Sequence, residues 1–455
     1  MSEADTPSIE RQKPIEVHEL FFSVTDRAGV IRGGNEVFRR IAGYDSIDEM
    51  IGKSHNIMRH PDMPRCVFKL FWDLLQSGRP VGAYVKNRAA DGSYYWVYAL
   101  AYPAKGGYLS VRFNPTGTLV DTMEKLYKEL RAIELESDEP NIRDEAMRVA
   151  GETLLARLRE LGFADYDKFF HMAVIMEMGI RARKVTMTSG DRVRGSVRGE
   201  LGPDFETWCR VENSLDRMFH QVESFLDLIS SLESKSKFLS NLAEEISLLA
   251  LNSLVACHRQ GDQARGLAVV AEGLSKIAQD AIRVISDMNT QIQELVDALR
   301  KTAGRITSAK LQSEVSIVYQ GELADRRNGS RLHDDTETMG ALTSTLIATV
   351  RRTAEMLPLI QVPVGGLRKE LRDLEGIVRA LSRVHVTGQV EAARMANSQI
   401  FVQIFAVVTE QITTARRELL GFTEEIDTLC RNLPQLERNT EALGAEIAAS
   451  HLAAA

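Results

Sequence analysis

Residues 55–64 (HNIMRHPDMP) form the densest run of side chains in this chain that are able to do chemistry. Arg59 supplies a permanent positive charge and a fork of donors, and His60 donates or accepts a hydrogen bond near neutral pH. These residue types suit the recognition of a polar or anionic group on a small molecule. A plainer interpretation stays open, in which Asp62 caps a helix with Pro64 in its first turn and His60 is a hydrogen-bonded loop residue.

Three further residues outside this run have side chains that suit either packing or binding. Asn35 and Asn87 carry amides that both donate and accept hydrogen bonds. Trp72 is either a core aromatic or one wall of a ligand slot, because aromatic side chains serve in both places.

The elements that must position these residues follow from turn signals and hydrophobic spacing. Alternation and β-branched or aromatic residues predict strands, and the dipeptide at 91–92 (DG) predicts a hairpin. The expected order is strands 19–25 and then a short one after the turn 26–29, helices 35–44 and 64–76, and strands 82–88, 93–102 and 107–113. This order predicts an α+β fold, a five-stranded antiparallel sheet with helices on one face.

The rest of the chain has helical spacing. Apolar or small residues recur every three or four positions in 239–256 and again in 267–288, which is the rhythm of a coiled coil. The polar, glycine-containing segment 260–266 between them predicts an antiparallel helical hairpin. Any helical bundle has similar spacing, so the two interpretations stay open.

Composition limits the function classes. The chain has 455 residues, 44% of them apolar, and a net charge of −7, which indicates more than one domain and argues against nucleic-acid binding. Four cysteines without paired spacing predict neither disulfides nor zinc, as expected in a reducing cytoplasm. We expect no membrane span, no targeting segment and no metal site, and the sequence has no kinase, cyclic-dinucleotide, zinc-protease or nucleophile-elbow motif, so we expect no enzyme.

The residues just described resemble the PAS sensor domain of bacterial aerotaxis receptors. The resemblance covers 18–114 and rests on the run 55–64 together with 85–88 (VKNR) and 94–96 (YYW). It implies a non-covalently bound FAD that reports its redox state, with cofactor contacts at Asn35, Arg59, His60, Asp62, Trp72 and Asn87. Val81 stands where the family often has a tryptophan, and Tyr84 is the residue expected to fill that space. The alternatives are a haem-binding gas sensor using His60 and a PAS domain without cofactor.

The hairpin resembles the signalling tip of methyl-accepting chemotaxis proteins. The resemblance rests on 248–252 (LLALN), 259–263 (RQGDQ) and 265–272 (RGLAVVAE). It implies docking to a chemotaxis histidine kinase and its coupling protein, or to other chemoreceptors. The implied partner contacts are Leu251, Asn252, Arg259, Asp262 and Arg265.

The tip departs from the family pattern at several positions, which places standard docking in doubt. Glu244 puts a charge where the family packs an aromatic side chain, and Ala256 replaces a glutamate. Residues 390–394 (VEAAR) echo the motif, as a decayed repeat or through helical composition, and we favour composition. Glu410 and Gln411 resemble a receptor methylation pair.

The sequence therefore predicts three parts: a PAS domain at 18–115, a helical connector at 116–230 and a chemoreceptor-like module at 231–455. The basic, aperiodic stretch 181–203 is interpreted as a linker, with phosphate or lipid headgroups as its alternative partners. The expected function is redox or oxygen sensing in the cytoplasm by a flavin-bound homodimer. The alternative is a cofactor-free scaffold that binds or modulates other receptors.

Overall fold

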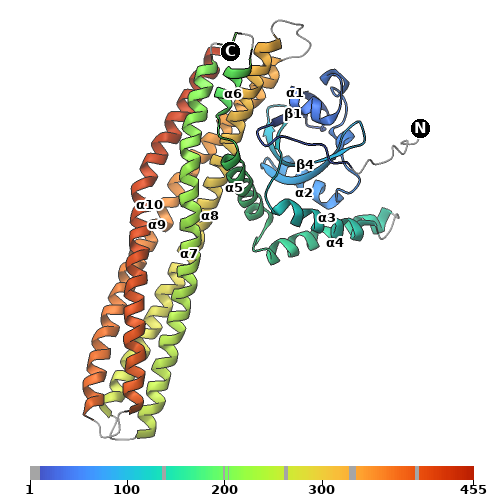
Figure 1. Cartoon of the computed structure of the whole chain (residues 1–455). Helices are drawn as coiled ribbons and strands as arrows, with labels where there is room; N and C mark the ends of the chain where they lie inside the picture. Colours follow the sequence, from blue (N-terminus) through green and yellow to red (C-terminus); the bar gives the residue numbers. More distant parts are fainter. Residues whose placement is uncertain are drawn as a thin grey trace. The chain divides into compact units, whose positions relative to one another are not determined.

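The computed structural model describes residues 11–135, 140–197, 200–202, 204–260, 265–326, 335–394 and 399–454 (Figure 1). The chain divides into two compact units. The first, here the sheet unit, comprises Met1–Val222, Ala303–Thr353 and Asn439–Ala455; the second, here the hairpin unit, comprises Glu223–Thr302 and Ala354–Arg438.

The sheet unit contains a five-stranded antiparallel sheet in the order β2-β1-β5-β4-β3. Its strands are β1 (Leu20–Asp26), β2 (Ile31–Gly34), β3 (Val81–Arg88), β4 (Tyr94–Ala104) and β5 (Gly107–Phe113). Local chemistry makes the turns: Asp26 accepts the N–H groups of Ala28 and Val30, and Gly92 between β3 and β4 has φ +83°. The predicted strands and fold class are confirmed.

Short helices follow β2 and precede β3. They are α1 (Glu36–Ala42), the 3₁₀ helices η1 (Ile47–Glu49) and η2 (His55–Met58), and α2 (Arg65–Gln76). The prediction that Asp62 caps α2 is wrong, because the helix begins after Pro64 and has no local side-chain cap. The buried carboxylate of Glu134 accepts the N–H groups of Arg65 (2.7 Å) and Cys66 (2.8 Å) instead.

The two faces of the sheet have different coverings. On the inner face Arg112 reaches Ser23 and the ring of Phe38 in α1, and Tyr95 reaches Met58 in η2. On the outer face the contacts come from later helices: Tyr84 donates to Glu177, Tyr127 donates to the carbonyl of Tyr84, and Phe22 packs edge-on against Tyr319. The helices α1, η2 and α2 thus cover one face, and helices that follow the sheet in the sequence cover the other.

The helices that follow the sheet are α3 (Leu119–Leu135), α4 (Pro140–Glu160), α5 (Tyr166–Lys184) and α6 (Ser189–Ser196). The stretch 181–203, expected to be an aperiodic linker, therefore contains the end of α5 and all of α6. Arg181 is buried there in an ion pair with Glu314 (2.6 Å), and the carboxylate of Glu212 accepts the N–H groups of Ser189 and Gly190.

Four long helices complete the chain: α7 (Phe205–Gln260), α8 (Arg265–Arg326), α9 (Asp335–Ala393) and α10 (Gln399–Ala454). Residues 261–264, in the segment where the sequence predicts the hairpin turn, lie outside the described residues. Helix α7 continues without a break through 230 and 231. The domain boundaries drawn from the sequence at 115 and 230 stay predictions.

Within the hairpin unit each helix has two neighbours. Polar contacts join α7 to α8 through Ser240 and Asn289, α9 to α10 through Arg368 and Asp427, and α10 to α7 through Glu425 and Lys235, while Gly366 of α9 lies against Gln291 of α8. Most of the predicted coiled-coil stripe is buried: Leu239, Leu242, Ile246, Ser253, Leu267, Val270, Leu274, Ala281, Val284 and Met288. We expected a second copy of the chain to cover the apolar stripe of α7 and α8. Helices α9 and α10 of the same chain cover it instead, so burial of this stripe requires no homodimer.

Several positions of the two hairpins have similar exposure. Residues 135 apart in α7 and α9 share their exposure: Ile246 and Leu381 are buried, as are Cys257 and Ala392, whereas Leu251 and Val386 are exposed, as are Val255 and Val390. Residues 138 apart in α8 and α10 do the same, with Val270 and Val408 buried and Val269 and Val407 exposed. The interpretation of 390–394 as helical composition stays a prediction.

Candidate functional site

The inner face of the sheet carries an arginine at its centre. Arg112 lies on β5, the middle strand, between Phe21 and Ala99, and only 4% of it is exposed. Its Nη2 donates to Ser23 Oγ (3.0 Å) and contacts His55 Nε2 at 2.6 Å. Because a guanidinium only donates, Nε2 is the acceptor and the ring proton of His55 is on Nδ1.

Aromatic rings surround this guanidinium. Phe38 lies under it, with 5.4 Å between the guanidinium carbon and the ring centroid, and stacks with His55. Burial lowers the pKa of Arg112 to about 10, and burial together with the nearby arginine holds the pKa of His55 well below its ordinary value of 6.5. His55 is therefore neutral, and Arg112 keeps its charge in an apolar setting.

Four of the predicted site residues lie together at the end of β3. Arg59 forms a β-bridge with Asn87, and its guanidinium donates to the carbonyl of Met63 while lying 4.5 Å over Phe68. Burial lowers the pKa of Arg59. The segment after η2 is thus fastened to β3.

His60 and Asp62 continue this cluster. The Nδ1 atom of His60 accepts the N–H of Asp62 (3.2 Å), and the Asp62 carboxylate pairs with Lys86 (2.6 Å). Burial lowers the pKa of His60, assisted by Lys86, so this ring is neutral. Although partial burial acts to raise the pKa of Asp62, Lys86 outweighs it and the pKa is lowered.

Asn35 makes its contacts elsewhere, where β1, α1 and α8 meet. Its Oδ1 accepts the N–H groups of Phe22 and Phe38, and its Nδ2 donates to the carbonyl of Leu20 and to Glu322 Oε1 (3.2 Å). The other carboxylate oxygen of Glu322 accepts the N–H of Glu36 (2.8 Å). Asn35 thus connects the first strand, the first helix and a helix of the second half of the chain.

Trp72 lies on α2 and packs edge-on against Tyr108 of β5, with the ring centroids 5.4 Å apart. It reaches this position next to Gly29, where an added Cβ would meet the indole at 3.2 Å. The expectation that Tyr84 fills the place of the missing tryptophan is wrong. Tyr84 points from the outer face to Glu177, and Val81 belongs to the opposite, inner register of the same strand.

The sequence prediction missed Arg112, His55 and Ser23. A signal was present in β5, where 109–113 (LSVRF) places a single basic residue inside a strand that otherwise carries no charge. Such a residue on the central strand is either paired or functional, because a buried charge is costly.

The side chains of the inner face are of the types that a flavin site uses. A flavin requires aromatic and apolar walls with a few donors for its carbonyl and nitrogen edge. Phe21, Phe38 and Tyr95 are buried aromatic side chains of the inner face, and Nη1 of Arg112 is a buried donor without a hydrogen-bond partner among the described residues.

A second candidate site is the end of the α7–α8 hairpin. Leu248, Leu251 and Val255 form an exposed apolar stripe on α7, and Val269 is 69% exposed near the start of α8. Exposed apolar side chains at spacings of three and four lie on one side of a helix, which makes this stripe a candidate surface for a partner. Four large apolar side chains are thus available there.

The remaining predicted tip residues have polar side chains. Asn252, Arg259 and Arg265 are exposed, and Asp262 lies outside the described residues. Glu244 is exposed too, so its charge carries no burial cost within the chain.

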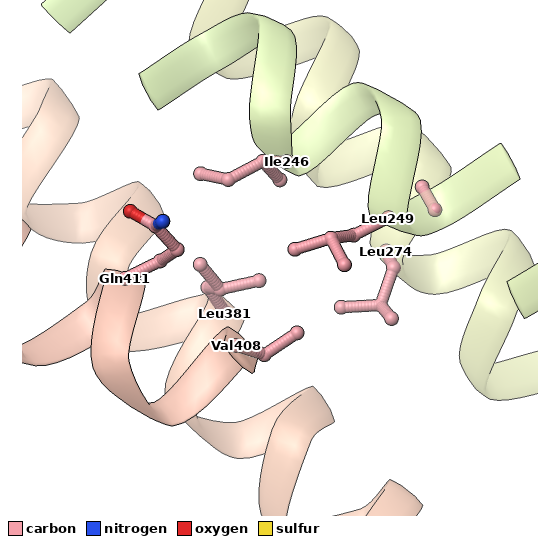
Figure 2. A pocket seen from close by; sticks show the side chains of 7 residues that line it. Ile246, Leu249, Leu274, Leu381, Val408 and Gln411 are labelled. Carbon is pink, nitrogen blue, oxygen red and sulfur yellow. The ribbon is translucent and has the colours of Figure 1, made fainter. Parts of the chain in front are cut away.

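The two residues of the predicted methylation pair differ in their exposure to solvent. Glu410 is exposed, whereas Gln411 is half-buried and donates to Glu245 of α7. Gln411 also lines a pocket inside the hairpin unit (Figure 2), with Ile246, Leu249, Ala250, Leu274, Leu381 and Val408. All four helices contribute to this apolar lining, so it is a packing gap of the core, and Glu410 alone is accessible.

Comparison with known proteins gives one family match and several similar proteins. The PAS fold family matches residues 34–108. The chain is 36% identical over 128 residues to the aerotaxis receptor of Escherichia coli (strain K12), covering 27% of this chain and 25% of the receptor. It is 27% identical over 148 residues to methyl-accepting chemotaxis protein HlyB of Vibrio cholerae, covering 31% of this chain and 25% of HlyB.

A similar match is 28% identity over 138 residues to methyl-accepting chemotaxis protein McpB of Bacillus subtilis, covering 28% of this chain and 20% of McpB. The matched parts are thus a quarter or less of these relatives. The chain contains a PAS domain and is similar to methyl-accepting chemotaxis proteins, which confirms both resemblances seen in the sequence.

Two further findings concern the hydrophobicity of the helices and the state of the cysteines. No helix in the described part is long and apolar enough to cross a membrane. All four cysteines, Cys66, Cys209, Cys257 and Cys430, are free thiols.

Proposed function

We propose that this protein is a chemotaxis signal transducer whose PAS domain binds FAD on the inner face of its sheet and reports redox state or oxygen to the helices. Its similarity to the aerotaxis receptor and to methyl-accepting chemotaxis proteins supports this proposal. The free thiols and the matched relatives suit action in the cytoplasm.

The observation that carries the proposal is the hydrogen bonding of Asn35. One amide holds β1 and α1 together and also bonds to Glu322 of α8. A change in the position of α1 therefore changes a bond to a helix that continues into the hairpin unit. A signal of this kind needs two states that differ in such contacts.

The residues of this chain have distinct parts in the proposed site. A bound flavin supplies redox chemistry that no side chain has. Phe38 and Tyr95 exclude water from the inner face, and Arg112 provides a donor and a positive charge. Arg59, Asp62 and Asn87 hold the segment after η2 against β3, and His60 stays neutral there.

The proposed output is binding to a chemotaxis histidine kinase and its coupling protein through the exposed apolar side chains at the end of the α7–α8 hairpin. Leu251 is the centre of this surface, with Leu248 and Val255 on either side of it along α7. A homodimer would use such exposed side chains, because the stripe inside the hairpin unit is already covered.

A reconstituted phosphorylation assay tests this function. The full chain is mixed with a chemotaxis histidine kinase and coupling protein, and the rate of kinase phosphorylation is measured before and after dithionite reduction. We expect the two rates to differ for the natural protein, and Glu322→Ala to reduce this difference. The control is Glu294→Gln, an exposed glutamate on the same helix, which should change nothing. Equal rates of kinase phosphorylation in the two redox states of the natural protein would refute the proposal.

A further inference from the structure

Arg112 has a charge that the described protein does not balance. Its hydrogen-bond partners are a hydroxyl and a neutral imidazole, and Nη1 is buried without a partner. No carboxylate among the described residues forms an ion pair with it. Other buried cations of the chain are balanced: Arg181 and Lys310 both pair with Glu314.

An unpaired buried charge is costly, and a neutral residue of similar volume is usually tolerated as well or better. A purely structural role at this position needs only donors to Ser23 Oγ and His55 Nε2, and the amide group of an uncharged side chain has two N–H donors. The positive charge therefore serves something beyond the described contacts. The walls around it are flat rings, Phe38 and His55, stacked with 6.3 Å between centroids.

We propose that Arg112 is the counter-charge for the acceptor edge of the flavin ring and that it binds the reduced, anionic ring more tightly than the oxidised ring. This inference rests on the flavin proposed above and names the residue that sets the midpoint potential of that flavin. Adding two electrons and one proton to the ring leaves it with one negative charge, which a guanidinium stabilises. His55 is the second residue of the site, and its neutral ring holds the guanidinium in place.

The central experiment compares the natural full-length protein with Arg112→Gln and Arg112→Met. Bound flavin per chain is measured by absorbance, and the midpoint potential is measured by dithionite titration with redox dyes. Arg112→Gln keeps a donor for Ser23, so this variant retains the inner-face contact. In both variants we expect the affinity for reduced flavin, relative to that for oxidised flavin, to fall at least tenfold. For a two-electron couple, a tenfold fall shifts the midpoint potential by about 30 mV in the negative direction.

Arg32→Gln is the matched control, since Arg32 belongs to the same sheet and is 54% exposed in its pair with Asp26. It should leave flavin content and potential unchanged, and Arg112→Lys should restore part of the lost potential because it restores the charge. A natural protein with flavin and Arg112 variants with unchanged potential would overturn this inference and leave the proposed function standing. A natural protein without flavin would overturn the proposed function and this inference together.

Discussion

Replacing Glu314 by glutamine should destabilise the sheet unit strongly. Glu314 lies on α8 and pairs with Arg181 of α5 (2.6 Å) and with Lys310 (2.9 Å), and at most a tenth of any of these three side chains is exposed. Arg181 also donates to the carbonyls of Val17 and His18, just before β1. The carboxylate therefore holds together α5, α8 and the approach to the sheet.

The magnitude follows from the pKa. Burial by itself raises the pKa of Glu314, but Arg181 and Lys310 outweigh burial and lower it from an ordinary value of 4.5 to about 2. A tenfold change in proton affinity corresponds to about 1.4 kcal/mol, so the ionised carboxylate contributes about 3 kcal/mol to folding. Removing it leaves two buried cations with less compensation, and breaking such a cluster costs about 3–5 kcal/mol.

Thermal unfolding followed by circular dichroism measures this effect. At roughly 2–4 °C per kcal/mol, Glu314→Gln should melt about 6–20 °C below the natural protein at pH 7. Because the folded pKa lies below the unfolded one, the contribution is complete above pH 4.5 and is lost as the pH falls toward 2. The difference between the two proteins should therefore shrink below pH 4.5.

The control is Glu206→Gln, which removes an exposed carboxylate paired with Arg194 in the same unit. Surface pairs contribute little, so its melting temperature should equal that of the natural protein. A melting temperature of Glu314→Gln within about 2 °C of the natural one at pH 7 would refute the reasoning, since even a single kcal/mol produces that shift. A large difference that stays constant down to pH 2 would refute the electrostatic cause.

The remaining predictions concern the hairpin unit. Leu251→Ser should weaken binding of the kinase–coupling protein complex about tenfold, whereas Leu420→Ser, an equally exposed leucine on α10, should not; equal binding of both variants in a pull-down titration would contradict the partner surface. The melting temperature of the full chain should stay constant over about a 100-fold dilution, because the apolar stripe is covered within one chain; a fall on dilution would indicate that a second copy completes the bundle.

The sheet could be predicted from the sequence because its signals are local. Asp26 and Gly92 make tight turns with their own neighbours, and alternation fixes which residues belong to each strand. The cap of α2 could not be predicted, because Glu134 comes from a helix far along the chain. Asp62 had the right residue type and distance for a cap, but Lys86 takes its carboxylate.

The hairpin unit shows a different limit. The spacing of Leu239, Ile246 and Leu274 predicted helices with a buried stripe, and these residues are buried. Spacing specifies a face and not its partner, so it could not reveal that α9 and α10 supply the other half. Arg112 was missed because a strand is predicted from its apolar residues. The surroundings of its charge are formed by Ser23 of β1 and His55 of η2, which are distant in the sequence.

The visible absorption spectrum of the full-length protein, purified from its native host before and after dithionite, tests the central claim most directly. We predict a two-banded flavin spectrum that bleaches on reduction and whose intensity falls in an Arg59→Ala variant. A protein that is colourless when purified from a flavin-replete cell would contradict the account and favour a cofactor-free scaffold, and a Soret band would favour a haem sensor.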